Sequence, residues 1–376
     1  MNLLPGSQQI HTVFCIDEDY APHLSALLLS IQANNNCFVH CHVIYQTLSS
    51  KSKERLISPL NEFMKVHFHK FNSSLNRCTL SERYTNRVTL TTYYRLYLTE
   101  ILPKKLDRVI YLDADLICMG SLLELWNIPL NGNMLGVVED SALSAEKRWN
   151  TLGLIEERYF NAGVLIIDLE AWRKKGIVAK LLQLADAQKD FEYNDQDVLN
   201  VEFNRNSIYL PKIWNAQSYD FKNNQIENTP QIIHFTGAEK PWHEYSVHPF
   251  KKEYLKYRRK TEWRQNIFEL NLSEMEEERL RCLVYTLMSN NKKEIYIYGA
   301  GQLGRKYKAA IERYYPWIKI KSYIDKDKSL NLNESKILNN LNQLDEDCMI
   351  FISSKAFRDE IIKDIVSNGI SESEII

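Results

Sequence analysis

The sequence predicts an α/β protein whose main domain has a mixed, mainly parallel sheet, followed by a smaller α/β domain. Over the first 100 residues, strand-like apolar runs alternate with segments of helical spacing in the order β-α-β-α-β. A second series of this kind begins near residue 293. The 376 residues also exceed the length of one average domain. We therefore expect a main domain over residues 1–265, a helical linker over 266–292 and a small domain over 293–376.

Each element of the main domain follows from the spacing of its apolar residues. The expected strands cover residues 12–16, 38–45, 66–71, 109–112, 135–138, 164–167 and 231–233. The expected helices cover residues 23–33, 49–63, 172–187 and 196–203. The fully apolar run 109–112 is typical of a central strand that is buried on both faces. Ligands of open α/β sheets bind beyond the carboxyl ends of strands, where Asp17 and Asp113 lie.

Composition excludes several classes of protein. A net charge of −1 provides no basic field, so we expect no nucleic-acid partner. No apolar run approaches the roughly 18 residues of a membrane span, and the first residues lack the charged and apolar parts of a signal peptide. The seven cysteines contain no C-x-x-C pair, as is typical of thiols in a reducing compartment. A cytoplasmic protein is expected, at most peripheral on a membrane.

Two aspartates follow the most apolar strand of the N-terminal half. Asp113 and Asp115 are two residues apart, so both carboxylates can turn toward one hard cation. Oxygen ligands of this kind suit Mg²⁺ or Mn²⁺. The D-x-D pattern alone is weak evidence, because it occurs five times in the sequence. A solvated strand-to-loop transition would produce the same pattern.

Six patterns, one of which contains Asp113 and Asp115, occur in order within the first 250 residues. They are CIDEDY (15–20), LTTYYRL (90–96), YLDAD (111–115), YFNAGVL (159–165), NDQD (194–197) and IHFTGAEKPWH (233–243). In these segments the chain resembles glycosyltransferase family 8, in particular bacterial lipopolysaccharide galactosyl- and glucosyltransferases of the retaining GT-A type. The resemblance implies a GT-A fold for residues 1–265. It also implies transfer of galactose or glucose from a UDP-hexose donor to a glycan or glycolipid acceptor, such as lipopolysaccharide or lipooligosaccharide core, at the cytoplasmic face of the inner membrane.

The resemblance also implies roles for single residues. Asp113, Asp115 and His234 would be the ligands of Mn²⁺ or Mg²⁺. The implied donor- and acceptor-binding set is Asp17, Tyr20, Arg95, Asp113, Ala114, Asp115, Asp140, Asn161, Asp195, Gln196, Gly237 and Lys240. A packed core histidine at His234 and a surface arginine at Arg95 are the alternatives that the residue types leave open.

Within this set, the resemblance implies distinct contacts with the nucleotide. Asp17 would pair with the uracil ring and Tyr20 would stack on it. Arg95 would reach the ribose or diphosphate through its forked donors. Gly237 would let the backbone approach the diphosphate, and Lys240 would offer it a point charge.

Asp195 and Gln196 are the expected catalytic pair. An oxocarbenium-like transition state needs hydroxyl contacts and partial negative charge near the anomeric carbon. Asp195 would hold sugar hydroxyls, with Asn161 beside it, and Asp140 stands where the family uses a carboxylate near the acceptor. An amide such as Gln196 is a poor nucleophile. This favours front-face attack, in which the leaving phosphate takes the acceptor proton and the metal acts as Lewis acid on UDP.

The small domain contains a glycine motif. Gly299, Gly301 and Gly304 form G-x-G-x-x-G after an expected strand and before an expected helix, the context of a dinucleotide fingerprint. Asp325 ends the next strand, near the expected place of a ribose partner. The roughly 85 remaining residues suffice for a half-Rossmann unit without a substrate domain. An NAD(P)-linked oxidoreductase or a nucleotide-sensing protein is the alternative function.

Residues 251–265 carry seven basic and two acidic side chains, interleaved with Tyr254, Tyr257 and Trp263. A solvated linker helix would account for this pattern. The functional alternative is an interfacial anchor, in which basic groups attract anionic headgroups while the aromatic rings lie at the membrane interface. Such a peripheral contact would suit an enzyme with a lipid-linked acceptor.

Overall fold

The computed structural model describes residues 8–71, 90–187, 191–226, 228–265, 267–270, 272–327, 337–338, 341, 344–345, 348–354 and 357–376. The chain divides into two compact units. The N-terminal unit comprises Met1–Lys240 and Lys252–Ile267, and the C-terminal unit comprises Pro241–Lys251 and Phe268–Ile376. The N-terminal unit matches most of the expected main domain, but residues 241–251 belong to the other unit.

A seven-stranded sheet forms the centre of the N-terminal unit within the described residues. Its strands, in spatial order, are β3 (Met64–Lys70), β2 (Phe38–Tyr45), β1 (Gln9–Ile16), β4 (Arg108–Leu112), β7 (Phe160–Asp168), β6 (Leu135–Glu139) and β8 (Ser207–Tyr209). Strands β3, β2, β1 and β4 are parallel, whereas β7 is antiparallel to both β4 and β6. The expected mixed, mainly parallel sheet is confirmed.

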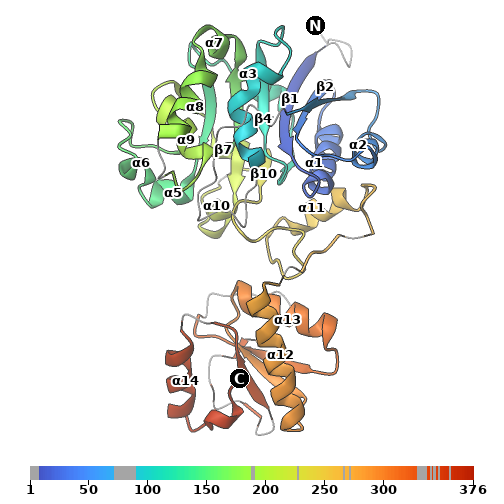
Figure 1. Cartoon of the computed structure of the whole chain (residues 1–376), viewed down its shortest axis with the longest axis vertical. Helices are drawn as coiled ribbons and strands as arrows, with labels where there is room; N and C mark the ends of the chain where they lie inside the picture. The colour runs from blue at the N-terminus through green and yellow to red at the C-terminus, as the bar shows by residue number, and fades with distance from the viewer. Residues whose placement is uncertain are drawn as a thin grey trace. The chain divides into compact units, whose positions relative to one another are not determined.

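Helices cover both faces of this sheet (Figure 1). One face packs against α1 (Ala21–Asn34), α2 (Ser50–Ile57) and α4 (Leu122–Trp126). The other packs against η2 (Leu90–Tyr97), α3 (Leu98–Ile101), α7 (Leu169–Lys174), α8 (Ile177–Ala187) and α9 (Asp195–Phe203). The expected helix over 172–187 is divided at Gly176, whose φ of +60° ends α7 before α8 begins. The expected helix over 49–63 ends at Ile57.

The remaining short elements of the N-terminal unit lie toward the carboxyl end of β4. They are β5 (Leu116–Cys118), α5 (Ser141–Ala145), α6 (Arg148–Thr151), η3 (Lys212–Asn215), β9 (Ala216–Gln217), α10 (Ser218–Lys222), β10 (Ile232–His234) and α11 (Lys251–Arg258). Strands β5, β10 and β9 form a second, small sheet. These elements carry several of the residues that the sequence marks as functional.

The C-terminal unit contains a parallel sheet of its own. Its strands, in spatial order, are β13 (Ile337–Leu338), β12 (Lys319–Ile324), β11 (Glu294–Tyr298) and β14 (Met349–Ile352). Its helices are α12 (Glu274–Ser289), α13 (Gln302–Tyr314) and α14 (Arg358–Ser367). The expected linker over 266–292 is wrong for α12, because Leu280, Leu283 and Leu287 are buried in the core of this unit.

The anchor hypothesis for residues 251–265 is wrong about two of its aromatic residues. Tyr254 and Tyr257 are 1% and 5% exposed, so neither ring can enter a membrane interface. The hydroxyl of Tyr254 lies 2.7 Å from His23 Nδ1 in α1. Trp263 is half-buried and packs against the apolar core between the sheet and α1, α2 and α4. Among the described residues, no helix combines the length and the apolar character that crossing a bilayer requires.

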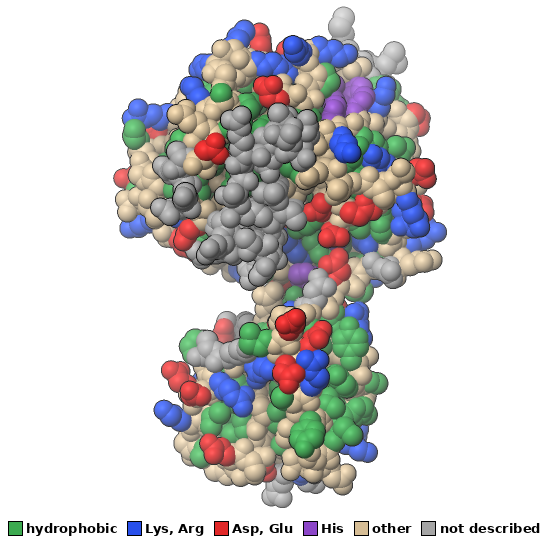
Figure 2. All heavy atoms as spheres, in the orientation of Figure 1, with side chains coloured by type: hydrophobic (Ala, Val, Ile, Leu, Met, Phe, Trp, Pro, Cys, Tyr) green, Lys and Arg blue, Asp and Glu red, His purple; other side chains and the backbone are tan. Residues whose placement is uncertain are grey.

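Within the described residues, five histidines lie on one face of β1, β2 and β3: His11, His40, His42, His67 and His69. The strand register pairs His11 with His40 and His42 with His67. Ring nitrogens are 3.1 Å apart in His11–His42 and His40–His67, and 2.9 Å apart in His42–His69. We name this group the histidine array. Figure 2 shows histidine side chains together at the surface over β1 and β2.

The histidine array makes stability sensitive to acid. Burial, together with neighbouring histidines, lowers the pKa of His11 to about 4 and that of His42 to about 3; Lys105 contributes to the shift of His11. Between pH 6.5 and 4 the unfolded chain therefore binds more protons at these sites than the folded chain. We expect the free energy of unfolding to fall over this window, measured as the urea midpoint at several pH values. A His11→Gln, His42→Gln variant should show a flatter pH dependence, and an unchanged slope would contradict this assignment.

Candidate functional site

A cluster of two carboxylates and one imidazole forms at the end of β4. Asp113 and Asp115 follow this strand, and β5 pairs antiparallel with β10, which places His234 opposite Leu116. His234 Nε2 lies 3.3 Å from Asp115 Oδ1 and 3.9 Å from Asp113 Oδ2. One ligand atom from each of the three residues lies within 4.8 Å of the others. His234 is buried, but beside these carboxylates and not only among apolar side chains.

Gly163 makes room for this cluster. It lies in β7 beside β4, and its carbonyl accepts the N–H of Asp113 at 2.9 Å. A Cβ atom at Gly163 would lie 2.2 Å from His234 Cε1 and 2.9 Å from Asp113 Oδ2. No side chain fits at such distances, so a glycine is required here for the imidazole and the carboxylate to meet.

Arg95 connects the cluster to Asp195. Its guanidinium donates to Asp113 Oδ1 at 2.9 Å and to the carbonyl of Ala162 at 2.6 Å. Its Nε lies 2.8 Å from Asp195 Oδ2. The Arg95 side chain is only 6% exposed, so the alternative of a surface arginine is wrong. Burial alone would lower its pKa, but the two carboxylates raise it and keep Arg95 charged.

Asp195 begins α9, directly after Asn194, a non-glycine residue with φ of +50°. This left-handed conformation carries backbone strain, which occurs often at functional sites. Burial raises the pKa of Asp195 to about 6, although Arg95 opposes the shift. Asp195 Oδ2 is buried and is paired with Arg95 Nε at 2.8 Å. The residue also lines a cleft with Arg95 and Asp113.

Gln196 is held by two hydrogen bonds. Its Oε1 accepts the N–H of Ala162 at 2.9 Å, and its Nε2 donates to Asp140 Oδ2 at 3.1 Å. Asp140 also accepts from Asn161 Nδ2 at 3.1 Å. In addition, it caps the start of α5 by accepting the N–H of Leu143. Burial raises the pKa of Asp140, while these donors oppose the shift. The predicted residues Asp140, Asn161 and Gln196 thus lie together.

Asn215 belongs to the same network, although no pattern in the sequence indicates it. Its Oδ1 lies 2.9 Å from His234 Nδ1, and its Nδ2 donates to Asn161 Oδ1 at 2.9 Å. A partner at Nδ1 fixes the orientation of the ring and leaves Nε2 toward the carboxylates. The chain of contacts Asp140–Asn161–Asn215–His234 is buried throughout. Only the folded chain brings η3 next to β10, so residue spacing could not reveal it.

Lys240 contacts the cluster on its other side. Its Nζ lies 2.6 Å from Asp115 Oδ2 and 2.6 Å from the carbonyl oxygen of Phe235. Although burial alone would raise the pKa of Asp115, Lys240 and His234 hold it well below its usual range. Gly237, between His234 and Lys240, has φ of +83°, a conformation that favours glycine.

Asp17 and Tyr20 follow β1, which is parallel to β4, with Val13 opposite Tyr111. The two strands therefore end at the same edge of the sheet. Asp17 Oδ1 accepts the N–H of Tyr20 at 3.1 Å, and Ala114, between Asp113 and Asp115 in the sequence, is buried. A cleft of about 140 Å³ at this edge is lined by Thr92, Arg95, Asp113, Ala162, Tyr193, Asn194, Asp195 and Gln196. Recognition of uracil by Asp17 and Tyr20 stays a prediction.

The glycine motif of the C-terminal unit has a structural explanation. Gly299 has φ of +101°, and a Cβ at Gly304 would lie 1.8 Å from the carbonyl oxygen of Gly299. Asp325 Oδ2 accepts the N–H of Ala300 at 2.7 Å. The carboxylate expected at a ribose is therefore bound to the loop itself. Close packing of the turn against α13 accounts for Gly299 and Gly304, while Gly301 has open space at its Cβ position.

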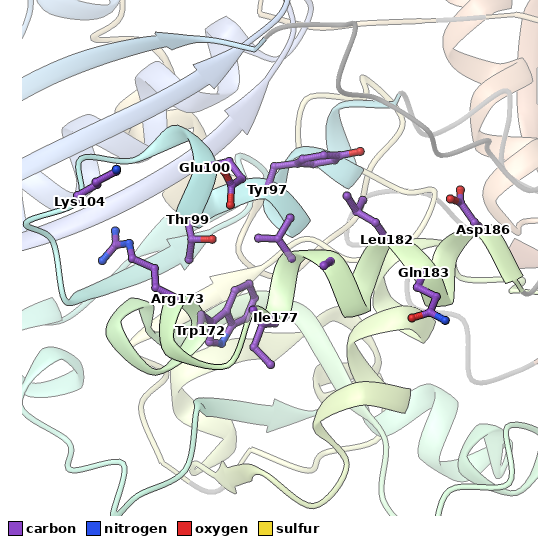
Figure 3. Close-up of a pocket in the computed structure, with 13 residues that line it drawn as sticks. Tyr97, Thr99, Glu100, Lys104, Trp172, Arg173, Ile177, Leu182, Gln183 and Asp186 are labelled. Atoms are coloured by element: carbon purple, nitrogen blue, oxygen red, sulfur yellow. The ribbon is translucent and has the colours of Figure 1, made fainter.

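A second, larger groove lies elsewhere in the N-terminal unit. It has a volume of about 1030 Å³. Figure 3 shows it between Tyr97, Thr99 and Glu100 on one side and the α7–α8 segment with Trp172 and Ile177 on the other. Its described lining residues include none of the predicted site residues. Size alone therefore does not mark the functional site of this chain.

Comparisons with known proteins agree with the geometry. Residues 11–246 match the family model described as Glycosyl transferase family 8. General stress protein A of Bacillus subtilis (strain 168) is 27% identical over 275 residues, 68% of this chain and 94% of that protein. Lipopolysaccharide 1,2-glucosyltransferase of Escherichia coli (strain K12) is 27% identical over 267 residues, 66% of this chain and 77% of that protein.

A solved structure shows the same fold. The galactosyltransferase LgtC, in complex with donor and acceptor sugar analogs, superimposes with a TM-score of 0.62 at 24% identity, over 72% of this chain and 99% of that one. The expected GT-A fold is thereby confirmed for the main domain. These comparisons do not favour the NAD(P)-linked oxidoreductase. Because the family model matches more than half of the sequence, the chain is a glycosyltransferase and belongs to family 8.

Proposed function

We propose that this glycosyltransferase moves a hexose, galactose or glucose, from a UDP-sugar to a glycan acceptor with retention of anomeric configuration. The observation that carries the proposal is the convergence of Asp113, Asp115 and His234 within 4.8 Å. Beside them lies a cleft lined by Arg95 and Asp195. The names of relatives that act on lipopolysaccharide support its core as the acceptor.

The donor set at the end of β4 fits a divalent cation. Two carboxylates suit Mg²⁺ or Mn²⁺, and the imidazole nitrogen of His234 favours Mn²⁺ over Mg²⁺. Asn215 holds the ring of His234 through its other nitrogen. A bound Mn²⁺ supplies Lewis-acid stabilisation to the departing diphosphate. Lys240 Nζ lies 2.6 Å from Asp115 Oδ2. In this proposal, once a cation binds that carboxylate, Lys240 places its charge on the diphosphate.

Arg95 and Asp195 hold the donor sugar in this proposal. Asp195 lines the cleft and is paired with Arg95, so in this proposal its carboxylate accepts a sugar hydroxyl while the guanidinium holds it in place. Arg95 fixes Asp195 and Asp113 relative to each other through its two ion pairs. The sugar hydroxyls and the diphosphate are thus bound by groups whose positions are set before the substrate arrives.

The hydrogen bonds of Gln196 favour front-face attack. Its amide oxygen already accepts the N–H of Ala162, and an amide is a poor nucleophile. In the proposed step the acceptor oxygen bonds to the anomeric carbon on the side from which UDP departs. The bond from that carbon to the UDP oxygen breaks, and the acceptor proton passes to the leaving phosphate. Asp140, with its raised pKa, lies beside Gln196 and positions the acceptor hydroxyl.

A donor and metal screen tests this proposal. We expect UDP release from UDP-galactose or UDP-glucose in the presence of Mn²⁺ and a lipooligosaccharide acceptor. Addition of EDTA should reduce the rate at least about 100-fold, because the diphosphate loses its counter-charge. GDP-mannose and ADP-glucose serve as matched donor controls, and NMR of the product determines the anomer. Equal rates with all nucleotides, or an inverted product, would contradict the proposal.

A further inference from the structure

We propose that the histidine array on β1, β2 and β3 binds a transition-metal ion of the zinc and copper class, at a site separate from the one around Asp113. Four of its rings form a closed set of neighbours. The distances between ring centroids are 4.7 Å for His11–His40, 5.4 Å for His40–His67, 4.9 Å for His42–His67 and 5.4 Å for His11–His42, and the rings are stacked with interplanar angles of 15–27°. Two imidazoles bound to one tetrahedral ion have centroids roughly 5 Å apart, given metal–nitrogen bonds of about 2.0–2.1 Å.

The backbone explains why these rings converge. His40 and His42 are two residues apart in β2, so their side chains leave the same face of the strand. His11 of β1 is opposite His40, and His67 of β3 is opposite His42. The three hydrogen-bonded strands thus place their imidazoles side by side on one face of the sheet. In the present side-chain conformations no three ligand nitrogens of these five described histidines converge within 4.8 Å, so an ion requires the stacked rings to rotate while the sheet holds the backbone.

The chemistry of the array favours nitrogen-seeking ions. The three contacts between ring nitrogens are N–H···N hydrogen bonds, in which one nitrogen of each pair accepts. Burial lowers the pKa of all five rings, so they are neutral at pH 7, as metal binding requires. Imidazole suits Zn²⁺ and Cu²⁺, whereas Mg²⁺ prefers oxygen ligands.

The charges near the array sharpen this selectivity. The positive charges of Lys65 and Lys105 contribute to the lowered pKa of His11, His40 and His67. A cation held mainly by its charge would therefore be repelled. An ion held by coordinate bonds to nitrogen would replace the two N–H···N contacts within the four rings, His11–His42 and His40–His67, with stronger bonds. In that state the ion would link β3, at the edge of the sheet, to β2 and β1.

Zinc titration of the full chain tests the proposal. Isothermal calorimetry should detect two zinc sites in the wild type. One site should remain in an Asp113→Asn, Asp115→Asn variant, because the array is intact. A His40→Gln, His67→Gln variant should also keep one site, with affinity at the array at least about tenfold weaker. Its transferase activity should be unchanged, and His243→Gln, in the C-terminal unit, is the matched control. Two full zinc sites in the His40→Gln, His67→Gln variant would overturn the proposal.

Copper spectroscopy gives a test that needs no change in the array. One equivalent of Cu²⁺ added to the Asp113→Asn, Asp115→Asn variant should give an electron paramagnetic resonance spectrum with splitting from at least two nitrogens. The site around Asp113 offers only the single nitrogen donor of His234. A spectrum with splitting from one nitrogen or none would contradict binding at the array, even if the histidine variants failed to fold.

Discussion

Replacement of Asp113 by asparagine should lower kcat/KM for sugar transfer by at least about 1000-fold. Asp113 pairs with Arg95 and lies next to His234, so its charge serves both the cation and the arginine that holds Asp195. Metal stabilisation of a departing diphosphate is worth several kcal/mol, and each 1.4 kcal/mol is about tenfold in rate. Steady-state kinetics with Mn²⁺, together with calorimetry of Mn²⁺ binding in the presence of UDP, measure the two effects.

The matched control for Asp113→Asn is Asp345→Asn. Asp345 is also the first residue of a D-x-D pair, but it lies in the C-terminal unit, where it pairs with Lys321. We expect this control to retain the wild-type rate and Mn²⁺ affinity. If Asp113→Asn kept more than about a tenth of the wild-type rate while folded, the cluster at the end of β4 would not be the catalytic metal site.

Gly163→Ala should weaken Mn²⁺ binding and lower transfer at least about 100-fold, although it changes no ligand. The added methyl group would lie 2.2 Å from His234 Cε1, so the imidazole must move away from Asp113 and Asp115. Overpacking of this kind also costs about 1–3 kcal/mol of stability. A 1 Å displacement of a catalytic group is enough for a loss of about 100-fold.

Two measurements separate displacement of the imidazole from simple unfolding. The urea midpoint reports stability, and calorimetry of Mn²⁺ binding in the presence of UDP reports whether the cluster of Asp113, Asp115 and His234 still binds the ion. Gly301→Ala is the matched control, because a Cβ there meets nothing within 4 Å. A fully active, metal-binding Gly163→Ala variant would show that the imidazole does not need its observed position.

The sequence was sufficient for the main sheet because local patterns determine it. The apolar run 109–112 predicted the central strand, and β4 is observed at Arg108–Leu112. The same reasoning assigned α12 to a linker, because an acidic helical stretch does not reveal that its leucines have a partner. The prediction that Tyr254 and Tyr257 of α11 lie at a membrane interface was wrong for the same reason, because the sequence does not show that they are buried. Charge patterning shows that a helix has two kinds of surface, but it does not show what covers the apolar one.

The candidate site could likewise be predicted only in part from the sequence. Asp113, Asp115 and His234 were connected by resemblance, since nothing in residue spacing joins positions 120 residues apart. The structure brings these three together, and it adds Asn215 and Gly163, whose importance depends on contacts between strands. An asparagine after a tryptophan and a glycine inside a strand are ordinary in sequence. Asn215 is distinguished by the 2.9 Å between its Oδ1 and His234 Nδ1. Gly163 is distinguished by the 2.2 Å that would separate a Cβ atom there from His234 Cε1.

The division of the chain has a consequence for any attempt to isolate its halves. Pro241–Lys251 belongs to the C-terminal unit, yet the chain then returns to the first unit for Lys252–Ile267. Glu244 forms an ion pair with Arg313, and His243 pairs with Glu269. A chain truncated after residue 267 would keep residues 241–251 but would lose Glu269 and Arg313, their partners in the C-terminal unit. Neither a cut after residue 240 nor one after residue 267 therefore separates the chain into its two units.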